Sequence, residues 1–96
     1  MIIDKGVSPG EVVTIKLTSG EELIASLVEE TDKYIKVSKP RVLAAAQGGI
    51  GMAPYLFTVD QDKTIKISAA TVVVLEPTER ESAKSYTEAT SSLIVL

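Results

Sequence analysis

The chain has 96 residues, of which 10 are Lys or Arg, 13 are Asp or Glu, and none is Cys or His. A chain of this length forms one domain, and the lack of Cys and His excludes disulfides, thiolate chemistry and the commonest general base and metal ligand. The formal net charge of −3 is not typical of a nucleic-acid-binding domain, although it is compatible with a local basic patch.

Residues 1–10 are predicted to be an irregular N-terminal segment, because Gly6, Pro9 and Gly10 are incompatible with a stable helix. The N-terminus has neither the basic start nor the apolar run of a signal peptide. No stretch approaches the ~20 apolar residues of a membrane span. By default we therefore expect a cytoplasmic protein with no membrane-inserted part.

Two antiparallel strands, residues 11–17 and 21–30, are predicted next, joined by a tight turn. Their alternating apolar residues are Val13, Ile15 and Leu17, and then Leu23, Ala25 and Leu27. This period of two is typical of half-buried strands. Ile24 and Val28 make the other face of the second strand apolar as well. Such a strand lies between two layers or bends so that each end serves a different layer, as in a small curved barrel.

Further strands are predicted at residues 34–43, 55–59, 64–67 and 71–75. Pro40 indicates a sheet edge or a bulge within the first of them. Residues 44–54 contain three glycines and a proline, which predicts a flexible loop. Residues 71–75 (TVVVL) have the composition of the most buried strand. Five or six short strands at regular spacing, with polar turns, predict an all-β fold, a small, strongly curved barrel over residues 11–77.

Residues 78–96 are predicted to form a C-terminal helix and an apolar tail. Thr78 and Glu81 have the spacing of a capping box, which favours a helix over about residues 79–91. Leu93–Leu96 are consecutive apolar residues, which need a surface to lie on. That surface is either this protein's own core or a neighbouring subunit.

No catalytic, metal or cofactor site is predicted. The GGIG sequence at residues 48–51 lacks the Gly-Lys-Ser/Thr of a phosphate-binding loop. Asp60 and Asp62 begin like a calcium loop, but the glycine and closing glutamate of that loop are missing. With no nucleophile beside a visible base, we expect a binding protein and not an enzyme.

Two stretches carry a family resemblance that covers roughly residues 10–77. The run VTIKLTSGEELIASLVEETDKYIKV, from Val13 to Val37, resembles the first motif of Sm-like proteins and of bacterial Hfq. The matching features are the alternation of the first strand, Gly20 in its turn, the long bent second strand and Asp32-x-Tyr34. The run TIKISAATVV, from Thr64 to Val73, resembles the second motif in its Hfq form.

The resemblance implies an open, bent, five-stranded barrel that assembles into a ring of roughly five to eight subunits. In such rings strand four of one subunit pairs with strand five of the next, which covers both edges. The residues expected at this interface are Tyr55, Phe57, Thr71, Val72, Val73 and Val74. The resemblance also implies binding of single-stranded RNA, commonly oligo-uridine or adenine-rich, in or near the central pore.

Four residues are implied to serve RNA binding. Tyr34 matches the aromatic residue that stacks on a base, and Asp32 matches the acid of the preceding turn. Lys66 matches the lysine of strand four, and Lys36 stands where other members have a base-reading asparagine. Alternatively, Tyr34 packs on a neighbouring loop. Independently of this, the alternative for Lys36 and Lys66 is that they are solvated on an exposed face or form ion pairs with Asp32 and Glu29.

A different functional class stays open beside RNA binding. The chain is then a structural or adaptor ring that binds protein partners through residues 44–54 or the C-terminal tail. The acidic balance of the chain favours this hypothesis. So do two departures from the family pattern: Ile67 stands where Hfq has a histidine, and the arginine-glycine pair of the eukaryotic second motif is missing. A monomeric SH3-like peptide-binding module is disfavoured, because its groove would need more aromatic residues.

Overall fold

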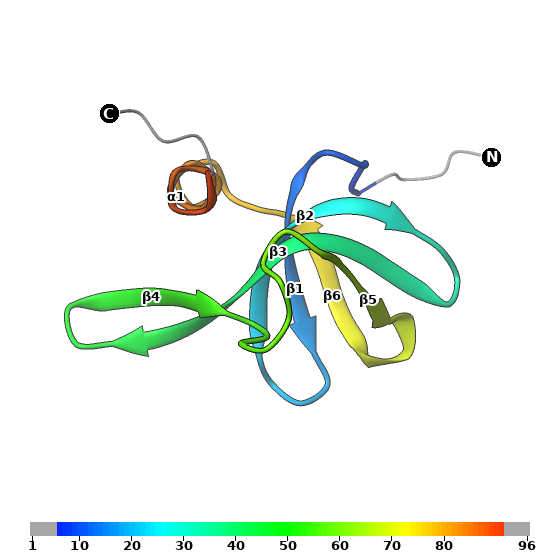
Figure 1. Ribbon diagram of the computed structural model, residues 1–96, viewed down its shortest axis with the longest axis horizontal. Coiled ribbons are helices and arrows are strands. Elements are labelled where there is room, and N and C mark those ends of the chain that lie inside the picture. The colour runs from blue at the N-terminus through cyan, green and yellow to red at the C-terminus, as the bar shows by residue number, and fades with distance from the viewer. Residues whose placement is uncertain (1–5, 92–96) are drawn as a thin grey trace.

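The computed structural model describes residues 6–91, which form six antiparallel strands and one α-helix (Figure 1). The strands are β1 (Val12–Leu17), β2 (Glu22–Glu30), β3 (Tyr34–Ala46), β4 (Gly49–Pro54), β5 (Thr64–Ser68) and β6 (Val72–Pro77). A short 3₁₀ helix, η1 (Ala69–Thr71), joins β5 to β6, and α1 (Arg80–Thr90) follows. The strand order is β4-β3-β2-β1-β6, and β5 pairs with the first half of β3. As predicted, the fold is mostly β with a C-terminal helix.

The hairpin of β1 and β2 supplies most of the core. Its inward side chains are almost fully buried; they are Val13, Ile15, Leu17, Leu23, Ala25 and Leu27. The hairpin turns at Gly20, whose N–H donates to the carbonyl oxygen of Leu17 at 2.9 Å. Gly20 has φ +102°, which glycine adopts without steric penalty. Burial of each large apolar side chain contributes ~1.5–3 kcal/mol, so this hairpin dominates the stabilisation.

β2 bends where its pairing with β3 is irregular. The register shifts between Ile24 and Ser26, and again between Leu27 and Glu29. Such bulges bend a strand and increase its twist. Ile24 is only 1% exposed, whereas Val28 on the same face is 40% exposed. The second apolar face of β2 therefore serves another layer at Ile24, where α1 lies nearby, and ends in solvent at Val28.

β3 is the longest strand and changes its partner midway. Residues 34–38 pair with β5 on one edge, and residues 41–46 pair with β4 on the same edge. Between them, Lys39 has φ +51°, a conformation that no other non-glycine residue adopts within residues 6–91. Pro40 follows and has no N–H to donate to a neighbouring strand. The change of partner therefore coincides with a break in the regular ladder.

The prediction of a flexible loop at residues 44–54 is wrong. These residues extend β3 and form β4, which are joined by a turn at Gln47 and Gly48. Residues 43–52, here termed the arm, project away from the other strands in Figure 1. A two-stranded ribbon exposes both faces, so its sequence lacks the apolar–polar alternation that identifies half-buried strands. With β4 included, the sheet has six strands, whereas the family resemblance implies five.

The prediction of a strand at residues 55–59 is also wrong. Tyr55, Phe57 and Val59 alternate as in a strand, but this segment is irregular. The side-chain amide of Gln61 donates to the carbonyl oxygens of Leu56 at 3.0 Å and Val59 at 3.1 Å. A side chain therefore satisfies groups that a neighbouring strand would otherwise pair. β5 is the strand that pairs with β3 after this segment.

β6 lies at an edge of the sheet, in contrast to the prediction that residues 71–75 form the most buried strand. Val72 and Leu75 pack against the core, but Val73 and Val74 are 61% and 40% exposed. β6 pairs with β1, and no strand among residues 6–91 covers its other edge. The apolar composition of β6 suits a strand with neighbours on both edges, but in the described part of one copy β6 has a neighbour on one edge only.

α1 is attached to β3 beside its break. Tyr86 is 1% exposed, and its hydroxyl lies 3.1 Å from the carbonyl oxygen of Ser38 and 2.8 Å from that of Lys39. The ammonium group of Lys39 donates to the carbonyl oxygen of Thr90 at 3.1 Å, one of the groups that a helix end leaves unpaired. Burial raises the pKa of the Tyr86 phenol above its ordinary value. Both attachments depend on the backbone conformation at Lys39.

The N-terminus of α1 is capped by Glu79, so the capping box expected from Thr78 and Glu81 is wrong. The Glu79 carboxylate accepts from the backbone N–H groups of Glu81 at 2.8 Å and Ser82 at 3.1 Å. The hydrogen bond from the Glu81 N–H, followed by those from Ser82, lowers the pKa of Glu79. The Thr78 hydroxyl instead lies 2.9 Å from that of Thr14.

The chain before β1 contributes to the folded domain. Val7 belongs to the core cluster and is 9% exposed. The Gly10 N–H donates to the carbonyl oxygen of Leu27 at 2.8 Å, and the Leu27 N–H donates to that of Glu11 at 2.9 Å. These bonds continue the pairing of β2 beyond β1. The expected apolar tail, Leu93–Leu96, lies outside the described residues.

Candidate functional site

Tyr34, Lys36 and Lys66 lie together on the outer face of β3 and β5. Ile35 and Val37 of β3 point into the core, where they are 3% and 0% exposed, so Tyr34 and Lys36 point outward. In the antiparallel register, Lys36 lies directly opposite Lys66. Side chains in opposite positions on one face are neighbours, with Cβ atoms about 5 Å apart. The register therefore brings the two lysines together beside the tyrosine.

The aromatic ring of Tyr34 is in contact with Lys66. The ammonium nitrogen of Lys66 lies 4.7 Å from the centre of the ring, which is the geometry of a cation–π interaction. At the other end of the side chain, the Tyr34 hydroxyl donates to Oε1 of Glu29 at 3.2 Å. The tyrosine is half-buried and is held at its ring and at its hydroxyl.

Glu29 also pairs with Lys36. Oε1 of Glu29 lies 3.7 Å from Nζ of Lys36, and the two side chains are 47% and 30% exposed. The pair follows from the register of β2 and β3, which places Glu29 opposite Lys36. Ion pairs this exposed contribute only about 0–1 kcal/mol, because water screens them. Lys36 can therefore exchange this carboxylate for another anion at little cost.

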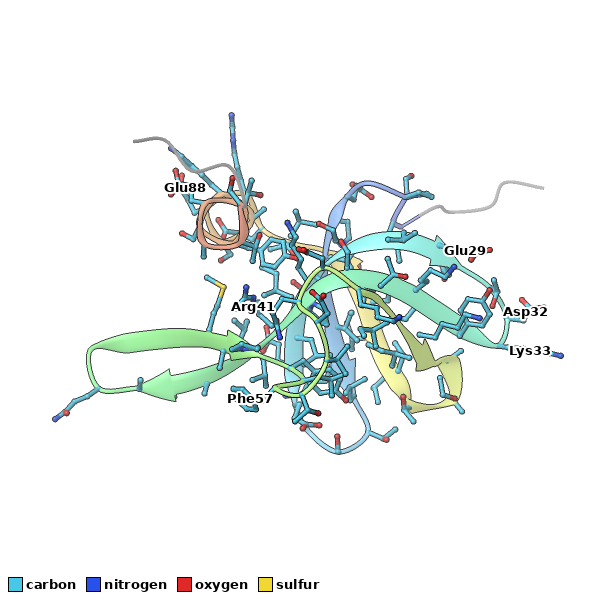
Figure 2. All side chains as sticks on the ribbon, viewed as in Figure 1. Glu29, Asp32, Lys33, Arg41, Phe57 and Glu88 are labelled. Carbon is cyan, nitrogen blue, oxygen red and sulfur yellow. The ribbon has the colours of Figure 1, made fainter. Side chains whose placement is uncertain are left out.

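The turn between β2 and β3 is closed by Thr31 and not by Asp32, the acid that the resemblance places in this turn. The Thr31 hydroxyl accepts from the backbone N–H groups of Lys33 at 3.1 Å and Tyr34 at 3.0 Å, and it lies 3.1 Å from the Tyr34 carbonyl oxygen. Asp32 is exposed at the tip of the turn (Figure 2). Asp32 therefore contributes a negative charge at this end of the molecule and does not fix the turn.

The two stretches that carry the family resemblance meet at this end of the sheet. The Ala69 N–H, at the start of η1, donates to the carbonyl oxygen of Lys33 at 2.9 Å. η1 itself is closed by the Thr71 hydroxyl, which donates to the carbonyl oxygen of Ser68 at 2.8 Å. Figure 2 shows Glu29, Asp32 and Lys33 together here, at the end of the molecule away from the arm.

The charges of this surface are nearly balanced within one copy. The basic side chains are those of Lys33, Lys36 and Lys66, and the acidic ones are those of Glu29 and Asp32, because Glu30 lies opposite Ile35 on the other face. An array of this kind attracts a polyanion only where the lysines of several copies come together or where the ligand displaces the carboxylates. A single copy therefore presents only a small net charge at this site.

The residues predicted for the subunit interface fall into two groups. Val72, Val73 and Val74 belong to β6 and lie along a free sheet edge, with Thr71 just before them in η1. Tyr55 packs against the core, and Phe57 is 77% exposed, but both belong to the irregular segment after β4. That segment offers no strand edge, and the free edge opposite to β6 in the sheet body belongs to β5.

Sequence reasoning included the Lys36–Glu29 ion pair among its alternatives but missed the hydrogen bond from Tyr34 to the same carboxylate. The signal was present in the spacing around the turn. In an antiparallel hairpin, residues equally distant from the turn lie opposite each other, which pairs Glu29 with Lys36 and Glu30 with Ile35. The position of Lys66 above the ring depends on the second motif and has no such local signal.

Within residues 6–91 no group of three or more Asp, Glu, Cys or His side chains is placed to hold a metal ion. In the same part of the chain, no helix has the length and apolar character needed to cross a membrane. No protein-family model and no curated protein matches the sequence. The functional assignment therefore depends on the geometry of the site and on the resemblance of the two motifs.

Proposed function

We propose that this protein binds single-stranded RNA as a homo-oligomeric ring of the Sm-like kind, through Tyr34, Lys36 and Lys66. The observation that carries the proposal is the ammonium group of Lys66 at 4.7 Å from the Tyr34 ring, with Lys36 opposite Lys66. Proteins that bind single strands combine aromatic rings, on which bases stack, with basic side chains that neutralise phosphates. The proposed activity is binding and not catalysis.

A base can replace Lys66 on the tyrosine ring at a net gain. An exposed cation–π contact is worth about 0.5–1 kcal/mol, whereas a base stacked on an aromatic ring is worth about 1–3 kcal/mol. Lys66 is exposed and flexible, so its ammonium group can move from the ring to an adjacent phosphate. The contact seen without ligand is thus compatible with stacking on Tyr34.

Ring assembly is supported by two free strand edges. Among the described residues, β5 pairs only with β3, and β6 pairs only with β1. The exposed Val73 and Val74 of β6 are apolar, which is unusual for an edge that stays in solvent. Pairing β5 of one copy with β6 of the next covers both edges. Repetition around a ring then concentrates the lysines of several copies.

The test is a fluorescence anisotropy titration of labelled oligo-uridine and oligo-adenine at low and then rising salt. The double variant Lys36→Ala/Lys66→Ala should bind more weakly, and the slope of log K against log salt should flatten by about 0.7 for each lost phosphate contact. The matched control is Lys16→Ala/Lys84→Ala, which removes the same charge from exposed positions on β1 and α1. No binding at low salt, or equal losses in both variants, would reject the proposal.

A second candidate is an adaptor ring that binds a protein partner and no nucleic acid. The observation that favours it is the Glu29 carboxylate, which already satisfies both the Tyr34 hydroxyl and Lys36. A site whose polar groups are paired within one copy has less to offer a ligand. In that case neither oligonucleotide binds, and partner capture maps to residues 44–54 or to the C-terminal tail.

A further inference from the structure

Within the described chain, the outer edge of β4 is unpaired and has no charged residue to protect it. β4 pairs with β3, and no other strand of residues 6–91 lies beside it. No charged residue occurs between Arg41 and Asp60, although 24% of the chain is charged. Proteins normally protect an exposed edge with charges, because its free N–H and C=O groups pair readily with another strand. The composition of the arm therefore favours a strand as its neighbour.

The hydrogen bond at the base of the arm shows which backbone groups face outward. The Tyr55 N–H donates to the carbonyl oxygen of Pro40 at 3.0 Å. In an antiparallel ladder the bonds to one neighbour recur at every second residue. The residues of β4 that bond to β3 are therefore Ala53, Gly51 and Gly49. The N–H and C=O groups of Ile50 and Met52 point outward, and Pro54 also falls at an outward position, where its missing N–H costs nothing.

The arm also has more exposed apolar surface than a lone ribbon can stabilise. Residues 44–51 are all exposed, and the Ile50 side chain is 74% exposed. Ile50, Met52 and Leu43 line one side of a groove of about 310 Å³, with Ser82 and Ser85 of α1 on the other. An isolated two-stranded ribbon is only marginally stable in water, whereas additional strands stabilise it.

We propose that two copies of this chain pair through β4, antiparallel and about a two-fold axis at Gly51. Ile50 of one copy then lies opposite Met52 of the other, and each of these residues donates one backbone hydrogen bond and accepts one. On the opposite face Gly49 lies opposite Ala53, so large residues meet large ones and small residues meet small ones. The result is a continuous ribbon in the order β3-β4-β4-β3.

The sequence of β4 selects this register and a second copy as the partner. An axis at Met52 would place Ile50 opposite Pro54, which cannot donate, and an axis at Ile50 would place Met52 opposite Gly48 in the turn. Identical strands bring identical charges together in many registers, but β4 has none. The edges of β5 and β6 are not used, so the pairing is independent of ring assembly and of RNA binding.

The first test is the variant Gly51→Cys, in a chain that has no other cysteine. A Cβ added at Gly51 meets no atom within 4 Å, so the fold tolerates it. At the axis the two copies of residue 51 form a non-hydrogen-bonded pair with Cα atoms about 4.5 Å apart, within the range of a disulfide. Mild oxidation at micromolar concentration should give a disulfide-linked dimer.

The matched control is Ala44→Cys, because Ala44 lies opposite Gly51 on β3 and is similarly exposed. In the proposed pair the Cα atoms of the two copies of residue 44 are three strand spacings apart, about 14 Å, which is too far for a disulfide. We expect the Gly51→Cys dimer to form at least tenfold faster. Equal rates for the two variants would overturn the proposal.

The second test introduces charged side chains on β4 and measures the mass of the assembly. Ile50→Lys alone, or Met52→Glu alone, should halve the mass of the assembly measured by sedimentation, because each places an unpaired charge opposite an apolar residue. An equimolar mixture of the two variants should recover the original mass, because the introduced lysine then lies opposite the introduced glutamate. Gln47→Lys, in the turn, should leave the mass unchanged. A mass unaffected by Ile50→Lys, or single copies of the unaltered protein at these concentrations, would overturn the proposal.

Discussion

At the residue scale, Glu29 determines how much free positive charge the candidate site presents. Its carboxylate accepts the hydrogen bond of the Tyr34 hydroxyl and forms the ion pair with Lys36. It therefore occupies the same groups that a phosphate and its adjoining base would use. Removal of this competing anion should favour RNA, whereas an adaptor that does not bind RNA would be indifferent to it.

We therefore expect Glu29→Gln to raise RNA affinity about two- to fivefold at low salt. This range corresponds to the roughly 0.5–1 kcal/mol of an exposed ion pair. Glu30→Gln is the matched control, because it removes the same charge from the next residue of β2, which points to the other face. Anisotropy titrations measure both. A weaker complex for Glu29→Gln, or the same gain for both variants, would show that Glu29 does not compete with RNA.

The neighbours of Tyr34 show how far the sequence alone could go at this scale. Period two and antiparallel pairing suffice to place Tyr34 and Lys36 on one face and Glu29 opposite Lys36. The choice of Thr31 to close the turn was not predictable, because Asp and Thr side chains both accept backbone N–H groups. Which of the two side chains closes the turn depends on the backbone dihedral angles of the turn, and neither residue type determines these angles.

At the scale of elements, α1 depends on its attachment to β3. It has 11 residues, a length at which isolated helices are only marginally stable in water. Tyr86 is the one buried residue of α1. The bonds from Tyr86 and Lys39 both lead to the break in β3. The helix and this break therefore stabilise each other.

Tyr86→Phe should lower the free energy of unfolding by about 1–2 kcal/mol. The ring stays in place, but the carbonyl oxygens of Ser38 and Lys39 lose a donor in a partly buried position. Urea denaturation at neutral pH measures the change, and Tyr55→Phe is the control for loss of a hydroxyl elsewhere. If the two variants were equally stable, the Tyr86 hydroxyl would have no structural role.

The effect of Tyr86→Phe on the free energy of unfolding should also depend on pH. Burial raises the pKa of Tyr86, so the fold favours the neutral phenol. Below the ordinary tyrosine pKa of about 10, both folded and unfolded chains are neutral at this group, and its contribution is complete. As the pH rises through the higher pKa of the folded state, that contribution is lost. The stability difference between the unaltered protein and Tyr86→Phe should therefore shrink above pH ~10, and a constant difference up to pH 11 would contradict this.

The elements that the sequence predicts well are those with one buried face. The hairpin of β1 and β2 has the alternation of such strands, and the structure buries its six inward residues as that pattern requires. Residues 44–51 of the arm are exposed on both faces, so no alternation marks them. For β6, composition indicates a strand that is suited to burial, whereas one copy leaves it at an edge. Both errors concern strands that one copy of the chain leaves exposed on a face or at an edge.

At the scale of the whole molecule, one copy leaves several strand edges unpaired. Within residues 6–91 the outer edges of β4, β5 and β6 have no neighbour. The formal net charge of −3 also opposes RNA binding by a separate copy, because each acidic copy repels a polyanion at long range. The proposed assembly would resolve both difficulties, since it would cover edges and gather lysines.

Val73→Lys should therefore abolish both ring assembly and RNA binding. Val73 is 61% exposed and does not pack against the core, so the fold of each copy should be retained. A lysine on the edge of β6 opposes strand pairing. The added positive charge would strengthen attraction to RNA if single copies bound it. Loss of RNA binding in this variant must therefore result from loss of assembly and not from the change of charge.

The matched control is Val28→Lys, which adds the same side chain at an exposed valine of β2, a strand with neighbours on both sides. Sedimentation and anisotropy on the same samples should show loss of both properties for Val73→Lys and of neither for Val28→Lys. An unchanged mass for Val73→Lys would remove β6 from the interface. If the variant disassembled but still bound RNA, Tyr34, Lys36 and Lys66 would bind RNA within one copy. Base stacking on Tyr34 would then have to supply the binding energy without a net positive charge at the site.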